Sequence, residues 1–215
     1  IIIEEWLEGE EFGAQAIIID GKLEKLMLHS DITTPPPRRV PIGHGCPHPS
    51  ESDLTPLVWG IVENAVAALG INNTISNIDF ILAKDGPKII EMTSRMGGTH
   101  LPEVCGTFWG IDMYDTALQI ALGMEILLPS RPRGVPNAIQ NLIFDQSGKV
   151  VRLGTMNDEF VWKLYFGDGD DVTLNAAKQA ELGYVQDVKS DVNSLLKSVT
   201  KAAEAFCSTT VYEVN

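Results

Sequence analysis

The hydrophobic pattern at the start of the chain is that of short strands. Apolar residues dominate 1–8 and 12–19, and Asp20-Gly21 is a hairpin-turn signal in front of a third apolar run at 22–29. The pattern therefore predicts three strands, of which the last two form a hairpin.

Residues 30–52 break this pattern. They are rich in Pro, Gly, Ser and His and show no periodicity, so we expect a long loop, and loops of this length in a compact domain are usually functional. A helix is predicted next, with Thr55 as its cap, Pro56 at its first position and Gly70 at its end. Its buried stripe is expected to consist of Leu57, Val58, Ile61, Val62, Ala65, Val66 and Leu69.

Two strands and a short helix are expected after this helix. Residues 77–83 and 87–95 have strand character on either side of the turn at 84–86. Asp112 is predicted to cap a helix that ends at Gly123.

Prolines at 129, 132 and 136 mark a linker, and the pattern changes after it. Short strands separated by acidic, Gly-containing turns are expected there, followed by an amphipathic helix over 191–206. The expected strands are 138–144, 149–153, 159–166, 171–174 and 182–189. The fold class predicted for the chain is therefore α+β, an antiparallel sheet with helices followed by a smaller β-rich domain with a terminal helix.

Composition narrows the class of protein. The chain has 215 residues, 44% of them hydrophobic, and its formal net charge of −13 argues against a surface for nucleic acid. No apolar run approaches the roughly 20 residues that span a bilayer, and no secretory leader is evident. The three cysteines are widely spaced, which indicates reduced thiols and a cytoplasmic protein. Because Ile1 opens directly inside a strand-like run, we expect an upstream part to be missing.

The most informative stretch is the hairpin at 77–98, in which acidic residues interrupt apolar strands. Alternate side chains of a strand share a face, so Glu91, Thr93 and Arg95 are predicted to point the same way. A three-residue loop at 84–86 would pair Asp79 directly with Glu91.

A two-residue turn at Asp85-Gly86 would instead pair Phe80 with Glu91 and send Asp79 to the other face. We favour the three-residue loop, with Gly86 left-handed, because it explains why both strands carry an acid.

Facing carboxylates repel each other and are costly to bury unless a cation lies between them. A hard cation with oxygen ligands, shared with nucleotide phosphates, is the usual solution, and the guanidinium of Arg95 is suited to a phosphate or carboxylate. The spacing alone also admits an exposed hairpin whose polar face only meets water.

The run EMTSRMGG at 91–98 resembles the Glu-x-Asn-x-Arg signature of ATP-grasp ligases. The resemblance implies that Asp79 and Glu91 hold Mg²⁺ (or Mn²⁺) and that Arg95 is a catalytic contact to the phosphoryl group or substrate. Thr93 stands in the Asn position as the third metal ligand, and a hydroxyl is a weaker ligand than an amide.

The acidic segment EEWLEGEE at 4–11 resembles the strand that joins the two lobes of that fold. By position, the resemblance places Glu4, Glu5 and Leu7 near the adenine of ATP and Glu11 on the ribose, with Glu10 as the alternative. Without the hairpin downstream, this run would be interpreted as a solvated strand end.

The resemblance also implies a domain organisation. Residues 1–127 would be the C-terminal part of an ATP-grasp domain and 128–215 a β-rich cap domain. The N-terminal domain and first ATP-grasp lobe, with its Gly-rich loop and lysines, would lie upstream.

The His-containing loop offers further candidates. His44 is expected to be a catalytic contact to substrate or phosphate, in a loop that covers the acyl site. Alternate positions of this loop hold His44, Cys46 and His48, a spacing that could place ligands around a metal ion. No second pair of ligands follows them in the sequence. His100 is expected either to line the pocket of Arg95 or to cap the next helix.

The function implied is that of an ATP-dependent ligase of the amino-acid or dipeptide type. It would activate a carboxylate as an acyl phosphate for attack by an amine, with small-molecule substrates, no nucleic-acid or membrane partner, and homo-oligomerisation left open. The alternatives are a purine-pathway or biotin-carboxylase-like ATP-grasp chemistry, or a non-catalytic nucleotide-binding module.

Overall fold

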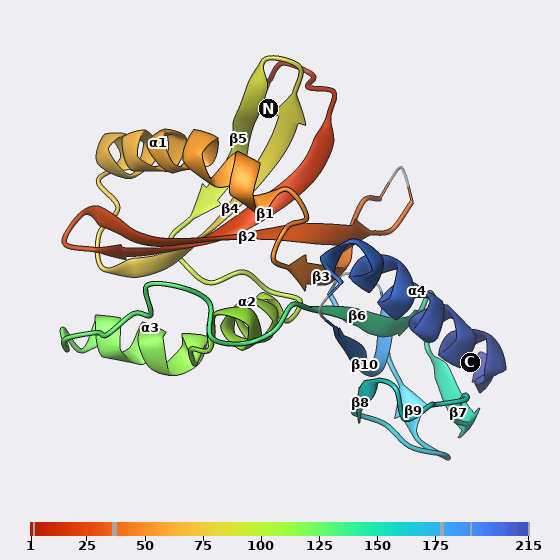
Figure 1. Ribbon diagram of the computed structural model, residues 1–215. Coiled ribbons are helices and arrows are strands. Elements are labelled where there is room, and N and C mark those ends of the chain that lie inside the picture. Colours follow the sequence, from red (N-terminus) through yellow and green to blue (C-terminus); the bar gives the residue numbers. More distant parts are fainter. Residues whose placement is uncertain (2, 36–37, 177–178, 190, 215) are drawn as a thin grey trace. The chain divides into compact units, whose positions relative to one another are not determined.

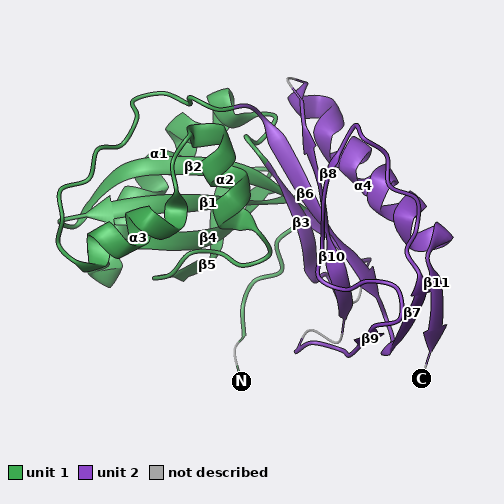
Figure 2. Ribbon diagram, turned by 90° about the horizontal axis from the view of Figure 1, so that it is seen from below, with its two compact units in different colours: residues 1–31, 46–134 green, residues 32–45, 135–215 purple. Residues whose placement is uncertain are grey.

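The computed structural model describes residues 1, 3–35, 38–176, 179–189 and 191–214, and the chain forms two compact units. Unit 1 contains residues 1–31 and 46–134, and unit 2 contains residues 32–45 and 135–215 (Figure 2). Both combine antiparallel strands with helices, which confirms the predicted α+β class.

Unit 1 is built on an antiparallel sheet whose strands follow the order β5-β4-β1-β2 (Figure 1). The strands are β1 (Glu10–Ile19), β2 (Lys22–Thr33), β4 (Thr74–Ala83) and β5 (Gly86–Thr93). The predicted Asp20-Gly21 turn joins β1 to β2, and both residues have positive φ (50° and 71°), as the tight hairpin turns require.

Three helices of unit 1 flank this sheet: α1 (Glu51–Leu69) on one side, and α2 (Leu101–Trp109) and α3 (Met113–Ala121) on the other (Figure 1). Gly70 ends α1 in the left-handed conformation, as predicted. The carboxylate of Asp112 accepts the backbone N–H groups of Tyr114 and Asp115, so the predicted cap of α3 is confirmed.

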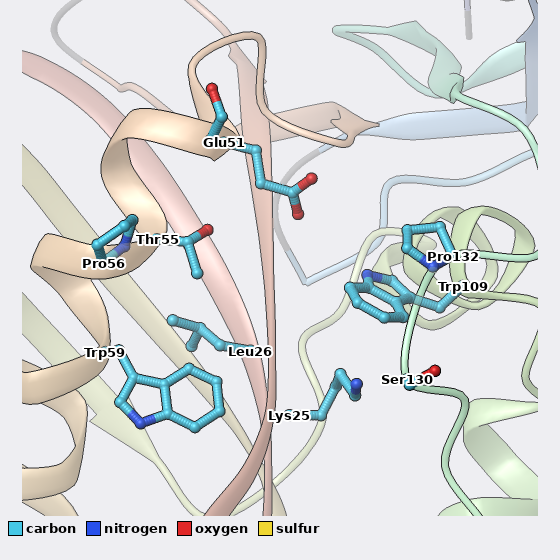
Figure 3. A pocket seen from close by; sticks show the side chains of 10 residues that line it. Lys25, Leu26, Glu51, Thr55, Pro56, Trp59, Trp109, Ser130 and Pro132 are labelled. Carbon is cyan, nitrogen blue, oxygen red and sulfur yellow. The ribbon is translucent and has the colours of Figure 1, made fainter.

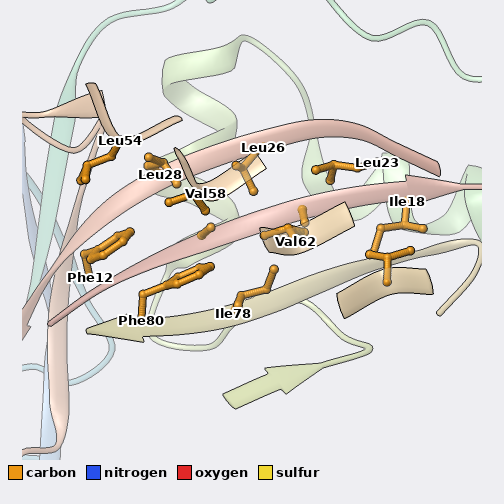
Figure 4. Packing of buried hydrophobic residues seen from close by; sticks show 13 residues of the cluster. Phe12, Ile18, Leu23, Leu26, Leu28, Leu54, Val58, Val62, Ile78 and Phe80 are labelled. Atoms are coloured by element: carbon orange, nitrogen blue, oxygen red, sulfur yellow. The ribbon is translucent and has the colours of Figure 1, made fainter. Parts of the chain in front are cut away.

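The core of unit 1 lies between α1 and the sheet (Figure 4). Alternate residues of β1 and β4 point into it and meet the buried residues of α1, and the rings of Phe12 and Phe80 stack 5.0 Å apart. The predicted stripe of α1 is wrong in part, because Leu57 and Leu69 are exposed and Leu54 is buried. Burying one such large apolar side chain is worth about 1.5–3 kcal/mol. The core residues include Phe12, Ala14, Ala16, Ile18, Val58, Val62, Val66, Ile78 and Phe80.

The strand predicted over residues 1–8 is wrong. Residues 3–8 have no regular structure, Ile2 lies outside the described residues, and β1 begins only at Glu10, which pairs with Leu82 of β4. A strand needs a partner for its backbone groups, and the antiparallel pairing of β1 with β4 starts only at Glu10, opposite the C-terminal end of β4.

The prediction of an unstructured loop over 30–52 is also wrong in part. β2 continues to Thr33, and β3 (Pro41–Cys46) follows within the stretch. The helix begins at Glu51, not at Pro56, which is accommodated in the second turn of α1. Acidic residues in the first turn favour the earlier start through the helix dipole. The helix α2 was not predicted.

Unit 2 contains strands in the order β3-β6-β10-β8, the small sheet β11-β7-β9, and one long helix. The new elements are β6 (Asn137–Phe144), β7 (Gly148–Arg152), β8 (Val161–Leu164), β9 (Asp171–Val172), β10 (Ala180–Val188), α4 (Val192–Thr209) and β11 (Val211–Val214). The predicted strands and terminal helix are confirmed within a few residues, and β11 was not predicted.

The helix α4 contributes one side of the core of unit 2, which it shares with residues of the strands. Its buried stripe includes Leu195, Val199, Ala203 and Phe206, as the periodicity indicated, and Asp191 caps its first turn. No helix in the described part of the chain has the length and apolar character needed to cross a membrane.

Candidate functional site: a polar face on the sheet of unit 1

The face of the unit 1 sheet that points away from α1 carries a cluster of polar side chains. Asp79 pairs with Gly13 of β1 and with Glu91 of β5, and Asn77 pairs with Gln15 and Thr93. Residues paired across antiparallel strands share a face. We call this cluster the polar face, and define it as Gln15, His29, Asp31, Asn77, Asp79, Glu91 and Thr93.

The predicted register, with Asp79 opposite Glu91, is confirmed, but the loop argument for it was wrong. The turn comprises only residues 84–85, Ala83 pairs with Gly86, and the ladder then shifts at Ile90. This bulge at Ile90 lets Ile89 and Met92, three positions apart, both pack against the core. Glu91 is thereby directed to the polar face.

The carboxyl of Asp79 lies in an environment that disfavours its charge. Burial raises the pKa of Asp79, and the nearby carboxylates of Asp31 and Glu91 raise it further. A hydrogen bond from Asn77 and the proximity of His29 oppose this rise without cancelling it. A cation between Asp79 and Glu91 would remove the repulsion, and carboxylate oxygens are ligands that fit Mg²⁺.

A chain of side-chain amides ties Asp79 to the segment after β5. The Gly97 N–H donates to Gln15 Oε1 over 3.0 Å, Gln15 Nε2 donates to Asn77 Oδ1, and Asn77 Nδ2 donates to Asp79 Oδ1 over 3.0 Å. Gln15 is completely buried. We call Gln15 and Asn77, with these bonds, the amide relay.

The relay requires a glycine at position 97. A Cβ there would lie 2.4 Å from Leu101 Cδ1 and 2.5 Å from Asn77 Oδ1. Any other residue would therefore push the amide of Asn77 away from Asp79.

His29 and Asp31 extend the polar face along β2. His29 Nδ1 lies 3.0 Å from Asp31 Oδ1, and the His29 ring is buried against Gly13. Burial alone would lower the pKa of His29, but the charge and hydrogen bond of Asp31, together with Cys105 and Asp79, raise it. A protonated His29 would place a positive charge beside the acids.

Thr93 and Arg95 lie at the end of the hairpin. Thr93 Oγ1 is 3.4 Å from the carbonyl of Asn77, within the polar face. Arg95 lies beyond the end of β5, is exposed, and donates from Nη1 to the carbonyl of Met96 over 2.9 Å. β5 ends at Thr93, although the Asn77 N–H still donates to the carbonyl of Arg95 over 2.9 Å, and the expectation that Arg95 shares the face of Glu91 stays a prediction.

The expected nucleotide residues lie at the start of the chain. Glu4 and Glu5 are exposed and Leu7 is half-buried, all before β1. Glu11 is on β1, two residues before Gly13, so strand alternation places it on the side of Asp79. Glu10 is on the opposite side, with its carboxylate 3.6 Å from His48 Nε2.

The histidines of the predicted loop do not form one group. His44 is buried on β3 in unit 2, whereas His48 is buried in unit 1 against Phe12. His100 occupies the position before α2, with Nδ1 4.0 Å from Glu103 Oε2.

Sequence reasoning missed Gln15, His29, Asp31 and Asn77. The two-residue period of a strand could have identified them. Asn77 and Asp79 are two positions apart on one strand and so share a face, as do His29 and Asp31 on another. A polar residue such as Gln15 inside the apolar run FGAQAIII indicates a buried partner.

Comparison with known proteins gives distant relatives. No protein-family model matches the chain. It is 24% identical to carnosine synthase 1 of Gallus gallus over 132 residues, which cover 61% of this chain and 14% of that protein.

Solved structures match along nearly the whole chain. Phosphoribosylglycinamide synthetase from Anaerococcus prevotii matches with a TM-score of 0.79 at 23% identity, covering 98% of this chain and 55% of that one. An L-amino acid ligase from Bacillus licheniformis matches with a TM-score of 0.78 at 17% identity, covering 97% and 53%.

This chain thus spans about half of each of these structures and a smaller part of the carnosine synthase. Both solved structures are ATP-grasp ligases. This chain therefore has the fold of the corresponding part of these ligases, in agreement with the fold that the resemblance implied.

Proposed function

We propose that the full-length protein containing this chain uses ATP to join a carboxylate to an amine through an acyl phosphate. The observation that carries the proposal is the pairing of Asp79 with Glu91 on a face where burial and neighbouring acids raise the pKa of Asp79. A carnosine synthase and an L-amino acid ligase among the similar proteins support the amino-acid or dipeptide type.

Asp79 and Glu91, with Thr93 as a weaker third ligand, would hold Mg²⁺. When bound, such an ion neutralises phosphate charge as the phosphoryl group is transferred. The amide relay would keep the carboxylate of Asp79 in one orientation, since Asn77 donates to its Oδ1 atom.

ATP would lie along the start of β1. Glu11 is our proposed ribose ligand because it is on the same side of β1 as Gly13, which pairs with Asp79. The exposed backbone around Glu4, Glu5 and Leu7 offers donors and acceptors to the adenine edge.

The reaction balances without a covalent enzyme intermediate. A substrate carboxylate oxygen attacks the γ-phosphorus and ADP leaves; the amine nitrogen then attacks the acyl carbon, loses a proton, and phosphate leaves. The guanidinium of Arg95 would compensate the negative charge that develops. The role of His44 as a substrate or phosphate contact rests on the resemblance alone.

Product analysis tests the proposal. The full-length protein is incubated with Mg-ATP and single amino acids, and nucleotide products are separated. We expect ADP and phosphate, formed faster when a suitable carboxylate and amine are both present. AMP with pyrophosphate, or ATP hydrolysis that no carboxylate stimulates, would contradict the proposal.

A second candidate is ligation in purine synthesis, which the match to a phosphoribosylglycinamide synthetase favours. Turnover restricted to glycine with a phosphorylated sugar amine as acceptor would select it. The division into an ATP-grasp part at 1–127 and a cap domain at 128–215 is likewise part of this proposal.

A further inference from the structure

A cavity of about 560 Å³ opens in unit 1 beside β2, a size within the range of small-molecule sites. Figure 3 shows Glu51, Thr55 and Trp59 on the α1 side and Trp109 and Pro132 on the opposite side, with Lys25 of β2 below. None of these residues belongs to the polar face, so the ATP-grasp chemistry leaves this cavity unexplained.

Two tryptophans provide its aromatic walls. Trp59 extends from α1 and is half-buried, and Trp109 ends α2 and is 9% exposed. The ammonium of Lys25 lies 4.4 Å from the centroid of the Trp109 ring and donates to the carbonyl of Pro129 over 2.8 Å. Lys25 is therefore already engaged, and its position shows that the Trp109 ring attracts cations.

The indole N–H of Trp109 is a donor that the fold leaves unused. Its Nε1 atom is buried and has no hydrogen-bond partner among the residues that the structure describes. Leaving a buried donor unsatisfied costs roughly 1–3 kcal/mol, so most such groups have a partner. An acceptor atom in the cavity would supply one.

The carboxyl of Glu51 is the complementary group. It is half-buried at the start of α1, and within the described part of the chain no cation pairs with it. Burial raises the pKa of Glu51 to about 7. A positive charge brought into the cavity would restore its ionised form.

We propose that this cavity binds a small aromatic amine: its ammonium group on Glu51, its ring against Trp59 and Trp109, and an acceptor oxygen on the Trp109 N–H. Glu51 selects a cation, and the tryptophans select an aromatic body. The inference is independent of the proposed ligase activity and concerns a different part of unit 1.

Calorimetry with a matched series of probes tests the proposal. Tyramine has the ammonium, the ring and an acceptor oxygen; tyrosol replaces the ammonium with a hydroxyl; phenethylamine lacks the phenolic oxygen; 4-hydroxyphenylacetate is an anion. We expect tyramine to bind about tenfold more tightly than tyrosol, because only tyramine can form a charge-assisted hydrogen bond with Glu51. It should also bind more tightly than phenethylamine, which has no acceptor for the Trp109 N–H. The anion should bind least.

Variants assign the binding to this cavity. Glu51→Gln should weaken tyramine binding about tenfold and leave tyrosol unchanged, because only the charge is removed. Trp59→Leu should weaken both, and Glu63→Gln, an exposed acid on the same helix, should change neither. Circular dichroism verifies that each variant is folded.

Three results would overturn the proposal. The first is that tyramine shows no saturable binding up to about 10 mM. The second is that tyrosol or the anion binds as tightly as tyramine or more tightly, and the third is that Glu51→Gln leaves the affinity for tyramine unchanged.

Discussion

Two acidic side chains on neighbouring strands are central to the chemistry that we propose for unit 1. Asp79 and Glu91 are paired across β4 and β5, and the carboxylate of Glu91 is one of the groups that raise the pKa of Asp79, after burial and Asp31. Asp79 is half-buried and Glu91 is exposed, so the pair lies at the border between the sheet and solvent. Such a pair is suited to a cation that is also shared with a ligand.

Glu91→Gln should therefore lower ATP turnover by the full-length protein about a hundredfold or more, because the metal loses a charged ligand. Thr93→Asn should be tolerated or activating, since an amide oxygen is a better ligand than a hydroxyl. Steady-state rates at saturating Mg²⁺ measure both. A loss in Thr93→Asn as large as that in Glu91→Gln would show that Thr93 has another role.

Glu51 gives a prediction about pH. Its pKa of about 7 in the folded state lies above the ordinary value of 4.5, so the folded protein holds the proton more tightly. The associated stability is complete below pH 4.5 and is lost as the pH rises through 7. Glu51→Gln cannot ionise and should escape this loss.

We therefore expect Glu51→Gln to raise the melting temperature more at pH 8 than at pH 5. The shift in melting temperature at pH 8 should exceed the shift at pH 5 by about 2–4 °C for each kcal/mol of unfolding free energy that ionised Glu51 costs the wild type. Solvent screening at this half-buried site reduces that free energy. Thermal unfolding followed by circular dichroism at the two pH values measures it, with Glu63→Gln as the control. An equal shift at both pH values would contradict the assignment of the pKa to Glu51.

At the scale of elements, the strands with strong alternation and the well-capped helices were predictable. The Asp20-Gly21 turn, the Gly70 stop and the Asp112 cap are local signals that the structure confirms. The pairing of Asp79 with Glu91 was also predicted, from the need to place both acids on one face.

The features that could not be predicted from the sequence depend on tertiary contacts. The bulge at Ile90 exists because Ile89 and Met92 both reach the core, and no local rule specifies it. β3 is held by its neighbour in the sheet and lies in a Pro- and Gly-rich stretch with no period. The amide relay needs Gln15 and Asn77, 62 residues apart, to meet.

The amide relay gives the prediction at this scale. Asn77→Leu should increase the Mg²⁺ concentration for half-maximal rate roughly 10–100-fold, because Asp79 loses its orienting donor. ATP turnover against Mg²⁺ concentration measures this, and the maximal rate at saturating Mg²⁺ should fall much less. Gln119→Leu removes a similar amide–carboxylate bond, to Asp115 on α3, and should leave the curve unchanged. An unchanged Mg²⁺ requirement in Asn77→Leu would refute the role.

At the scale of the whole molecule, the chain comprises two units and covers about half of each solved ligase that it resembles. Residues 1–215 contain the acidic hairpin and the start of β1 but no Gly-rich loop of the kind that covers phosphates in this fold. Under the proposed function, the residues that would hold the metal ion and the ribose lie in this chain, and other parts of the full-length protein would contact the phosphates.

Residues 1–215 alone should consequently bind Mg-ATP much more weakly than the full-length protein does. Isothermal titration calorimetry on both compares the two affinities directly. Micromolar affinity in residues 1–215 alone would mean that this part of the fold suffices for the nucleotide.

The most direct test of the central claim is to trap the acyl phosphate. Hydroxylamine converts acyl phosphates to hydroxamates, so the full-length protein is incubated with Mg-ATP, pools of amino acids and hydroxylamine. We predict that hydroxamate and amide product together equal the ADP released, and that both depend on a carboxylate and are lost in Glu91→Gln. ADP release with neither hydroxamate nor amide product, or hydroxamate formed together with AMP, would contradict ligation through an acyl phosphate.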